Sequence, residues 1–264
     1  MLLELDRVDK IFGGLHAVKG VCVRMDQGEI FGLIGPNGAG KTTLFNVITG
    51  VYRPDGGRVL FDGSDISGWA PARIASAGIG RTFQNIRLFR SMTAEQNVMV
   101  AGHRLHQAGV LSAVFRNKGY ADDERRLLRR AHELLEALGL SQHRSEVAGS
   151  LPYGSQRRLE IARALMLSPK LLLLDEPAAG MNTEEARALE TQIRWLRDEL
   201  KIGIVLVEHN MSVVMGVCER VHVVDHGETI AEGTPEVIKA HPKVLAAYLG
   251  QDVSEPVHDP VRQP

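Results

Sequence analysis

The chain of 264 residues has few cysteines and no long apolar run. Its two cysteines, Cys22 and Cys218, lie far apart and lack metal-ligand spacing, so we expect reduced, partly buried thiols of a cytosolic protein. No apolar run approaches the roughly 18 residues of a membrane span. The N-terminus alternates apolar and charged residues, unlike a signal peptide. If the protein acts at a membrane, another chain must provide the span.

Charge of one sign is not in excess. The chain has 31 Lys and Arg against 32 Asp and Glu, a formal net charge of -1. This balance excludes a global basic field that would recruit nucleic acid, although local patches remain possible. The length allows one large domain or two modest ones, and in either case a substantial apolar core.

One stretch between positions 35 and 43 fits the phosphate-binding loop pattern G-x-x-x-x-G-K-[ST]. Residues 29–34 before it have the length and apolarity of a strand, and residues 43–50 after it have the pattern of a helix ending on glycine. A chance glycine-rich turn would lack this context. The candidate nucleotide ligands are Gly35, Asn37, Gly38, Ala39, Gly40, Lys41, Thr42 and Thr43.

The residue types of this loop suit phosphate chemistry. Gly38 and Gly40 let backbone N–H groups turn toward a phosphate without a Cβ in the way. The following helix adds free N–H groups and the positive end of its dipole. We expect Lys41 to hold the β- and γ-phosphates and Thr42 to ligate Mg²⁺.

The hydrophobic pattern predicts alternating strands and helices around this loop. Residues 94–140 are expected to be helical, and the basic residues of 116–130 most simply form a solvated helix face, with lipid headgroups or RNA as the alternative contact. An apolar cluster at 86–89 is either local core or a docking surface. The expected strands are 2–12, 21–25, 59–61, 78–84, 171–174, 204–207, 221–225 and 228–231, and the further helices are 71–77, 157–165, 183–200, 234–240 and 241–249.

Four polar residues follow predicted strands and are candidates for catalysis. Asp175 ends the apolar run 171–174, as a Mg²⁺-handling carboxylate does in phosphate-loop NTPases, and Glu176 is a candidate base for the attacking water. Adjacent acids can instead cap a helix, but Pro177 interrupts an immediate helix start. Gln84 and His209 alone would indicate little, but together with the other motifs they become candidates. Gln84 could contact the metal and the attacking water, and His209 could sense a γ-phosphate.

Together these residues resemble the ATP-binding cassette (ABC) family over roughly residues 2–250. In this resemblance Phe12 is the adenine-stacking aromatic, although a plain core phenylalanine is equally compatible with its position. Residues 35–43 match the Walker A loop, Gln84 the Q-loop, 151–156 the signature, 171–176 Walker B, 179–182 the D-loop and His209 the switch histidine. The order and spacing of all seven make the resemblance specific.

Further features resemble the LivG-type ATPase of branched-chain amino acid importers. They are residues 80–89, the long helical stretch before the signature, residues 175–182 and the ending 246–250. The competing subfamily is the lipopolysaccharide-export ATPase, which has a similar ending, a shorter helical region and usually Asp where this chain has Asn182. A soluble, non-transport ABC ATPase is a further alternative, but such proteins usually carry long coiled coils or two cassettes.

The signature departs from the family pattern at two positions. Pro152 stands where a serine hydroxyl usually contacts the γ-phosphate across a dimer, and Ser155 stands where Gln is usual. Proline is acceptable at a helix start, and Gly154 with the helix N-terminus can still face phosphate. We therefore expect Tyr153, Gly154 and Ser155 to bind nucleotide, with slower turnover. An alternative with still less activity is a nucleotide-binding switch that hydrolyses ATP at a negligible rate.

The resemblance implies an α/β phosphate-loop NTPase fold with a RecA-like core, an antiparallel β subdomain and an α-helical subdomain. It implies one nucleotide-binding domain over 1–250, with the helical part at about 88–166, and a disordered tail at 251–264. Mg²⁺ is expected at Thr42, Gln84 and Asp175, and ATP as substrate. The implied partners are transmembrane permeases, a second ATP-binding subunit in a head-to-tail sandwich and a solute-binding protein, with no nucleic acid. The implied location is the cytoplasmic face of a bacterial membrane.

Overall fold

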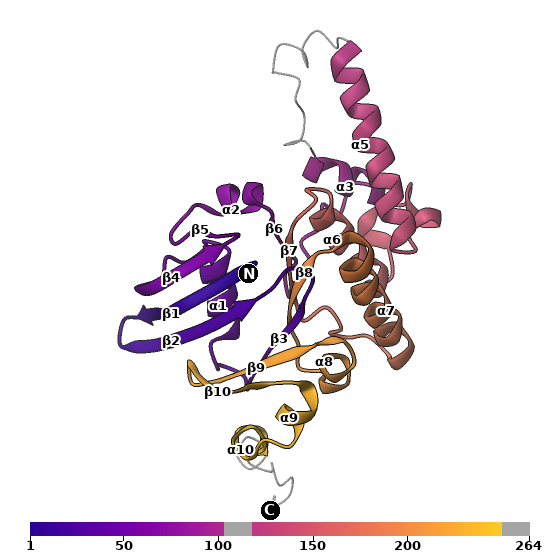
Figure 1. Cartoon of the computed structure of the whole chain (residues 1–264). Coiled ribbons are helices and arrows are strands. Elements are labelled where there is room, and N and C mark those ends of the chain that lie inside the picture. Colours follow the sequence, from indigo (N-terminus) through magenta and orange to yellow (C-terminus); the bar gives the residue numbers. More distant parts are fainter. Residues whose placement is uncertain (103–117, 250–264) are drawn as a thin grey trace, which may run out of the picture.

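The computed structural model describes residues 1–102 and 118–249, which form two β-sheets and a set of helices (Figure 1). The smaller sheet is antiparallel, with strand order β2-β1-β4-β5. Its strands are β1 (Leu3–Phe12), β2 (Leu15–Met25), β4 (Gly56–Phe61) and β5 (Ser64–Asp65). The expected N-terminal hairpin is confirmed, although β2 begins six residues earlier than the pattern predicted.

The larger sheet has strand order β10-β9-β3-β8-β7-β6. Its first five strands in chain order run parallel, and only β10 pairs antiparallel to its neighbour. The strands are β3 (Ile30–Ile34), β6 (Ile79–Arg81), β7 (Leu171–Asp175), β8 (Gly203–Val207), β9 (Arg220–Asp225) and β10 (Glu228–Gly233). Because β6 ends at Arg81, Gln84 lies in the loop beyond the strand and not at its end.

The parallel sheet is buried on both faces, as its uninterrupted apolar strands predicted. Side chains alternate across a strand, so Leu172 and Leu174 of β7 join one core cluster while Leu171 and Leu173 join the other. The first cluster lies under the helices on one face. The second fills the space between the two sheets, around α1 (Lys41–Ile48). The phosphate loop thus connects a fully buried strand to a helix that is packed between two sheets (Figure 1).

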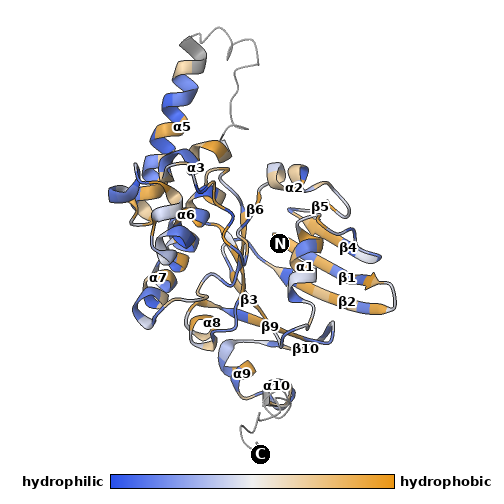
Figure 2. Cartoon of the chain, turned by 180° about the vertical axis from the view of Figure 1, so that it is seen from behind, coloured by the Kyte–Doolittle hydropathy of each residue, from blue (hydrophilic) through white to orange (hydrophobic). Residues whose placement is uncertain are grey.

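Helices lie on both faces of the parallel sheet, while α5 projects away from it (Figure 1). The helices carry both polar and apolar residues, as the colours of α7 show in Figure 2, and α7 buries its apolar Ala186, Leu189, Ile193 and Leu196. Besides α1 they are α2 (Pro71–Ala77), α3 (Ala94–Gly102), α5 (Lys118–Ala137), α6 (Tyr153–Leu165), α7 (Thr183–Leu200), α8 (Met211–Val217), α9 (Pro235–Lys239) and α10 (Pro242–Leu249), with short 3₁₀ turns at Ser141–His143 and Ala148–Ser150. The sequence pattern had not indicated α8.

The predicted helical stretch 94–140 contains α3 and α5, while 103–117 lies outside the described residues. On α5, Arg125, Arg126 and Arg130 form ion pairs with acidic side chains three residues away. Such surface pairs are typical of a solvated helix face. The predicted tail at 251–264 also lies outside the described residues. In the ranges that the structure describes, no helix is both long and apolar enough to cross a membrane.

Candidate functional site

The phosphate loop has the glycine conformations that its sequence required. Gly40 has φ 104°, and a Cβ there would come within 2.5 Å of the carbonyl oxygen of Ala17. At Gly35 a Cβ would lie 2.0 Å from the carbonyl oxygen of Val224. A Cβ at Gly38, with φ 77°, would instead enter open space at the mouth of the loop. The loop is therefore closed behind and open in front, which is the shape that a phosphate needs.

Lys41 lies at the bottom of this open side and is almost fully buried. Its Nζ donates hydrogen bonds to the carbonyl oxygens of Gly35, at 2.6 Å, and Pro36, at 2.8 Å. Burial lowers the pKa of Lys41, while the carboxylates of Glu176 and Asp175 favour its charged form. An ammonium group held here by its own loop is placed to bind an anion entering the loop.

Asp175 is buried at the end of β7, where its carboxylate forms an ion pair with Arg81 at 3.0 Å. Burial raises the pKa of Asp175, and Arg81 opposes that rise. Arg81 also donates to Asn46 Oδ1 and Thr49 Oγ1 of the phosphate-loop helix and its end. Sequence reasoning missed Arg81, and the available signal was that it is the one charged residue of the predicted strand 78–84.

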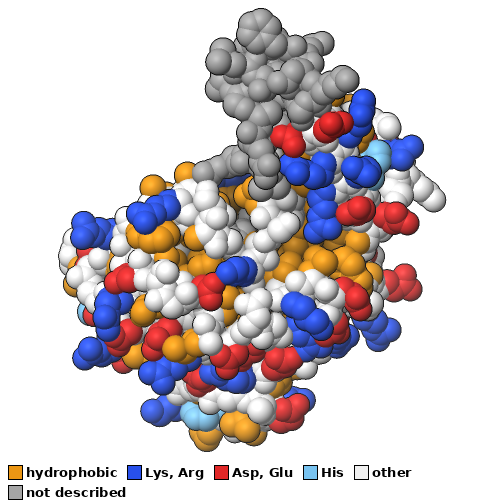
Figure 3. Space-filling model, turned by 45° about the horizontal axis from the view of Figure 1, so that its top comes forward, with side chains coloured by type: hydrophobic (Ala, Val, Ile, Leu, Met, Phe, Trp, Pro, Cys, Tyr) orange, Lys and Arg blue, Asp and Glu red, His pale blue; other side chains and the backbone are white. Residues whose placement is uncertain are grey.

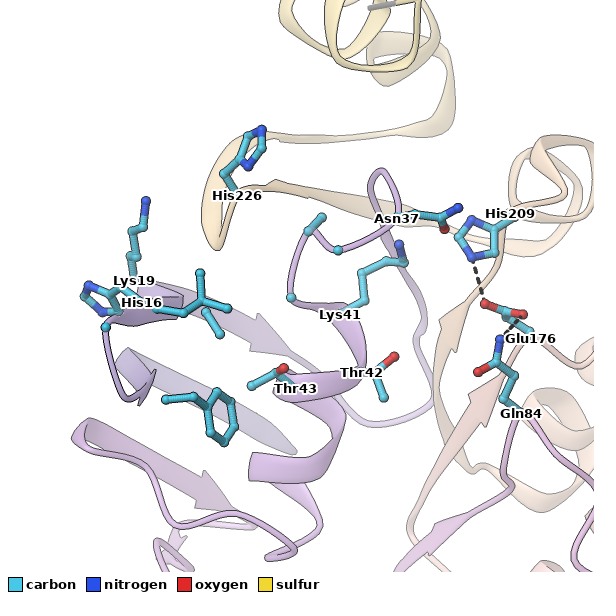
Figure 4. Close-up of a pocket in the computed structure, with 17 residues that line it drawn as sticks. His16, Lys19, Asn37, Lys41, Thr42, Thr43, Gln84, Glu176, His209 and His226 are labelled. Atoms are coloured by element: carbon cyan, nitrogen blue, oxygen red, sulfur yellow. Dashed lines mark hydrogen bonds and ion pairs between the residues drawn. The ribbon is translucent and has the colours of Figure 1, made fainter. Parts of the chain in front are cut away.

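Glu176 brings two of the other predicted residues together (Figure 4). His209 Nε2 lies 2.7 Å from Glu176 Oε1, and Gln84 Nε2 donates to Glu176 Oε2 at 2.9 Å. Glu176 has a left-handed backbone, with φ 48°, which costs a non-glycine residue about 1–3 kcal/mol and is typical of functional sites. Its N–H is fixed to the carbonyl oxygen of Val207 on β8 at 2.8 Å.

Glu208 is a second residue that sequence reasoning left without a role. Its buried carboxylate accepts hydrogen bonds from the backbone N–H groups of Ala178 at 2.6 Å, His209 at 3.1 Å and Asn210 at 3.2 Å. Burial raises the pKa of Glu208, and these three donors favour its ionised form. Glu208 therefore holds the backbone on both sides of His209 against the segment that follows Glu176.

These elements surround one cavity of about 640 Å³. Its lining includes Phe12, the phosphate loop, Gln84, Glu176 and His209, and Figure 4 shows the last three of these together with Lys41. Phe12 is 39% exposed and contacts Tyr52 edge to face at 5.1 Å between ring centroids. It is therefore not a core residue, and Lys10 Nζ lies 5.2 Å from the centroid of its ring.

Two of the three candidate metal ligands line this cavity. Thr42 and Gln84 line it, whereas Asp175 is held by Arg81 behind it. Among the described residues, no three His, Cys, Asp or Glu side chains form a metal-binding cluster. Mg²⁺ usually binds through one or two protein oxygens together with water and phosphate, so this oxygen donor set fits Mg²⁺ better than a protein-enclosed transition metal.

The signature residues lie apart from the cavity. Tyr153, Gly154 and Ser155 form the first turn of α6, and none is among the described residues that line the cavity. Pro152 is the N-cap of this helix and provides no side-chain cap, as expected of proline at a helix start. Ser155 is buried, and its hydroxyl accepts a hydrogen bond from Arg158 at 3.0 Å. Tyr153 is 45% exposed.

Comparisons with known proteins agree with this geometry. Residues 18–179 match the family model described as ABC transporter, and residues 228–254 match that of the branched-chain amino acid ATP-binding cassette transporter. The chain is 44% identical to the high-affinity branched-chain amino acid transport ATP-binding proteins BraF of Pseudomonas aeruginosa and LivG of Escherichia coli, over 95% of this chain and 98% of each relative.

Solved structures give the same result. The ADP conformation of MJ1267, an ATP-binding cassette of an ABC transporter, superimposes with a TM-score of 0.83 and 34% identity over 94% of this chain and 98% of that one. A nucleotide-free ATP-binding cassette gives a TM-score of 0.82 at 33% identity, with the same coverage. The fold, the phosphate-loop site and the relatives thus agree, and the chain belongs to the ABC transporter family as one of its nucleotide-binding ATPases.

Proposed function

We propose that this chain hydrolyses ATP in the cavity between Phe12 and Glu176, as the ATPase of a branched-chain amino acid importer. The observation that carries the site is the arrangement of Gln84 and His209 around the carboxylate of Glu176, in the same cavity as Lys41. This places a candidate base beside a phosphate cradle. A water oriented by Glu176 could then attack the terminal phosphate, in line with the leaving group.

Each remaining residue of the site has a proposed role. Phe12 stacks on the adenine, and the backbone of residues 35–43 with Lys41 holds the phosphates. Thr42, Gln84 and Asp175 would hold Mg²⁺, directly or through water, and a bound Mg²⁺ would supply positive charge beside the phosphates. His209 keeps Glu176 in place and senses the terminal phosphate. Arg81 and Glu208 position Asp175 and His209 through the contacts described above.

The position of the signature supports a head-to-tail dimer. Tyr153 and Gly154 lie outside the cavity of their own chain, and we propose that they bind a nucleotide held by another subunit. We propose that ATP closes two such subunits on each other and that hydrolysis lets them separate. The second subunit is a copy of this chain or a related ATPase.

The substrate class rests on the comparisons. The relatives BraF and LivG are named for branched-chain amino acid transport, and the matched C-terminal model is specific to that type of cassette. These matches favour import over the lipopolysaccharide-export and non-transport alternatives. We therefore propose permease subunits and a solute-binding protein as further members of the complex. The ATPase would bind peripherally at the cytoplasmic membrane face, without nucleic acid.

A permease contact surface is proposed on the loop after Gln84 and the neighbouring helices. Leu88 packs against the core, whereas Phe89 is 47% exposed, so the apolar cluster predicted here is partly core and partly surface. On the face shown in Figure 3, hydrophobic side chains at the surface are bordered by Lys and Arg side chains. A groove is lined by Leu127 and Met166 together with Arg126, Arg129 and Arg130 of α5.

Affinity capture from native membranes in mild detergent, with mass spectrometry of the partners, tests the assignment. We expect two multi-span permeases, a second ATPase and a solute-binding protein. Uptake of labelled leucine by the reconstituted complex, with the Glu176→Gln variant as control, then tests the substrate. Capture of lipopolysaccharide-export permeases would transfer the chain to that system. Ribosomal or DNA-bound partners alone would contradict transport.

A further inference from the structure

Arg157 of the signature helix α6 makes a set of buried contacts but is not among the described residues that line the nucleotide cavity. The residue is only 3% exposed. Its Nη1 donates to the carbonyl oxygen of Phe83 at 2.7 Å, and its Nη2 donates to the carbonyl oxygen of Gln84. On its other side, Nε and Nη2 donate to the hydroxyl of Tyr153, at 3.1 and 2.8 Å. One guanidinium thus connects the signature to the backbone of the Gln84 loop.

Glu160, one turn further along α6, strengthens this connection. Its side chain is 1% exposed, and Oε2 lies 3.6 Å from Arg157 Nη1. Oε1 accepts a hydrogen bond from the backbone N–H of Arg87 at 3.2 Å. Arg157 and Glu160 therefore hold the loop at residues 83, 84 and 87. Removing an arginine and a glutamate from water is costly, so this pair differs from the exposed ion pairs of a solvated helix face.

The same loop carries the amide that contacts the candidate base. Gln84 Nε2 donates to Glu176 Oε2 at 2.9 Å, and Figure 4 shows this link in the cavity. The backbone of Gln84 is fixed by Arg157, and its side chain is fixed by Glu176. A continuous series of hydrogen bonds therefore runs from Tyr153 through Arg157 and Gln84 to Glu176, all within one chain.

We propose that Arg157 is a positioning residue that ties Gln84, and through it Glu176, to the state of the signature helix. The proposal rests on the roles proposed above for Gln84 and Glu176. When Tyr153 meets the nucleotide of a second subunit, movement of α6 is transmitted to the loop through the guanidinium. The planar fork of arginine suits this task because it contacts three oxygen acceptors in fixed directions, which a lysine ammonium cannot do.

The first test is Arg157→Gln in the full chain, compared with Arg163→Gln. Arg163 is on the same helix near Glu160, but its guanidinium lies 5.8 Å from the centroid of the Phe89 ring, and in the described part of the chain it donates no hydrogen bond to the Gln84 backbone. We expect Arg157→Gln to lower kcat on the order of tenfold or more, as small misplacements of catalytic groups do, while the Kd for a fluorescent ATP analogue stays within about twofold. Arg157→Lys should not restore kcat. Arg163→Gln should keep both values near wild type.

A structural readout separates positioning from general loss of folding. We expect Arg157→Gln to speed amide hydrogen exchange in the peptide 83–90 selectively, with the strand peptides 171–175 and 203–207 unchanged. If Arg157→Gln folds poorly, Tyr153→Phe supplies the second variant, since it removes one acceptor of Arg157 at an exposed position and should give the same local change to a lesser degree. Unchanged exchange at 83–90 together with unchanged kcat would overturn the proposal.

A double-mutant cycle tests whether Arg157 acts through Gln84. In a Gln84→Ala background that retains measurable turnover, Arg157→Gln should cause little further loss. If the fold-losses in kcat of the two single variants instead multiply in the double variant, Arg157 acts independently of Gln84, and the proposal is overturned. Glu176→Gln, measured in parallel, separates the failures. Full turnover of that variant would refute the proposed site itself, whereas loss of turnover there with normal Arg157→Gln kinetics would refute only the role of Arg157.

Discussion

Arg81 and Asp175 form an ion pair at 3.0 Å in which both side chains are almost completely buried, at 9% and 4% exposure. The pair joins the end of β6 to the end of β7, directly behind the nucleotide cavity. The guanidinium lies near the rings of Phe45 and Phe83, with its carbon 5.6 and 5.1 Å from their centroids. The carboxylate proposed to serve the metal is thus oriented by a cation that the motif pattern does not include, and this cation opposes the rise in the pKa of Asp175 that burial causes.

Arg81→Met should therefore destabilise the protein strongly, because it leaves Asp175 buried without its partner. Breaking a buried pair on one side costs about 3 kcal/mol or more, which corresponds to a fall in Tm of about 6 °C or more for a chain of this size. Thermal unfolding measures it. The control is Arg58→Met, since Arg58 pairs with Asp6 at the surface and should change Tm little. Equal Tm values for the two variants would contradict this account.

Glu176→Gln should keep ATP binding and nearly abolish hydrolysis. Glutamine has the same shape and can still accept from Gln84, but it cannot take a proton or orient water as a carboxylate does. A general base typically contributes about 10²–10⁴-fold to the rate, so phosphate release should fall by that order. Steady-state phosphate release and binding of a fluorescent ATP analogue measure the two properties separately. Unchanged turnover would remove Glu176 from the role of base.

The local motifs were readable from the sequence because their chemistry requires particular residues. A glycine is needed where φ is 104° at Gly40, and an apolar run is needed for a strand buried on both faces, such as β7. Lys41 and Glu176 follow from these two features, and the structure places both in one cavity. Their catalytic roles stay predictions.

The contacts between distant segments were not readable in the same way. Arg81 and Arg157 are charged, and a sequence pattern assigns charged residues to the surface, yet both are buried by partners 94 and 73 or 74 positions away. Their burial depends on how α6, β6 and β7 pack together, which periodicity does not specify. Glu208 likewise acquires its role only because Ala178 lies against it.

Lys41→Ala should weaken nucleotide binding, because it removes the only cation that the phosphate loop itself carries. The loss should be about tenfold or more in Kd, since a hydrogen bond to a charged group contributes about 1.5–3 kcal/mol. Titration with a fluorescent ATP analogue measures it. Lys170→Ala is the control, since Lys170 pairs with Asp62 on the surface away from the cavity. An unaltered affinity for ATP in Lys41→Ala would contradict the assignment of the loop.

Glu232→Gln should make the thermal stability of the protein less dependent on pH in the acidic range. The buried ring of His222, with Nδ1 at 2.9 Å, and Arg220 hold the pKa of Glu232 down to about 2. Because the pKa of Glu232 is lower in the folded than in the unfolded protein, its ionised carboxylate stabilises the fold at a pH above the unfolded-state pKa. This stabilisation is lost as the pH falls toward the folded-state pKa. The Tm of wild type should exceed that of the variant at pH 7, and the gap should narrow below about pH 4.5. A gap independent of pH would contradict the pairing.

Pro152→Ser tests the departure in the signature, and it separates two effects of one hydroxyl. Pro152 is the N-cap of α6 with no side-chain cap, so a serine there should stabilise the helix by about 1 kcal/mol, or about 2–4 °C in Tm. The same hydroxyl could contact the terminal phosphate of a partner subunit, which should raise ATP turnover.

Pro152→Ala is the matched control, because it restores the backbone N–H without adding a hydroxyl and should raise neither value to the same degree. A rise in Tm without a rise in turnover would assign the hydroxyl to capping alone. It would also show that Gly154 and the helix N-terminus suffice for the phosphate, so that proline at this position is no impairment of the ATPase. A rise in turnover only in the serine variant would instead identify Pro152 as the residue that slows this subunit.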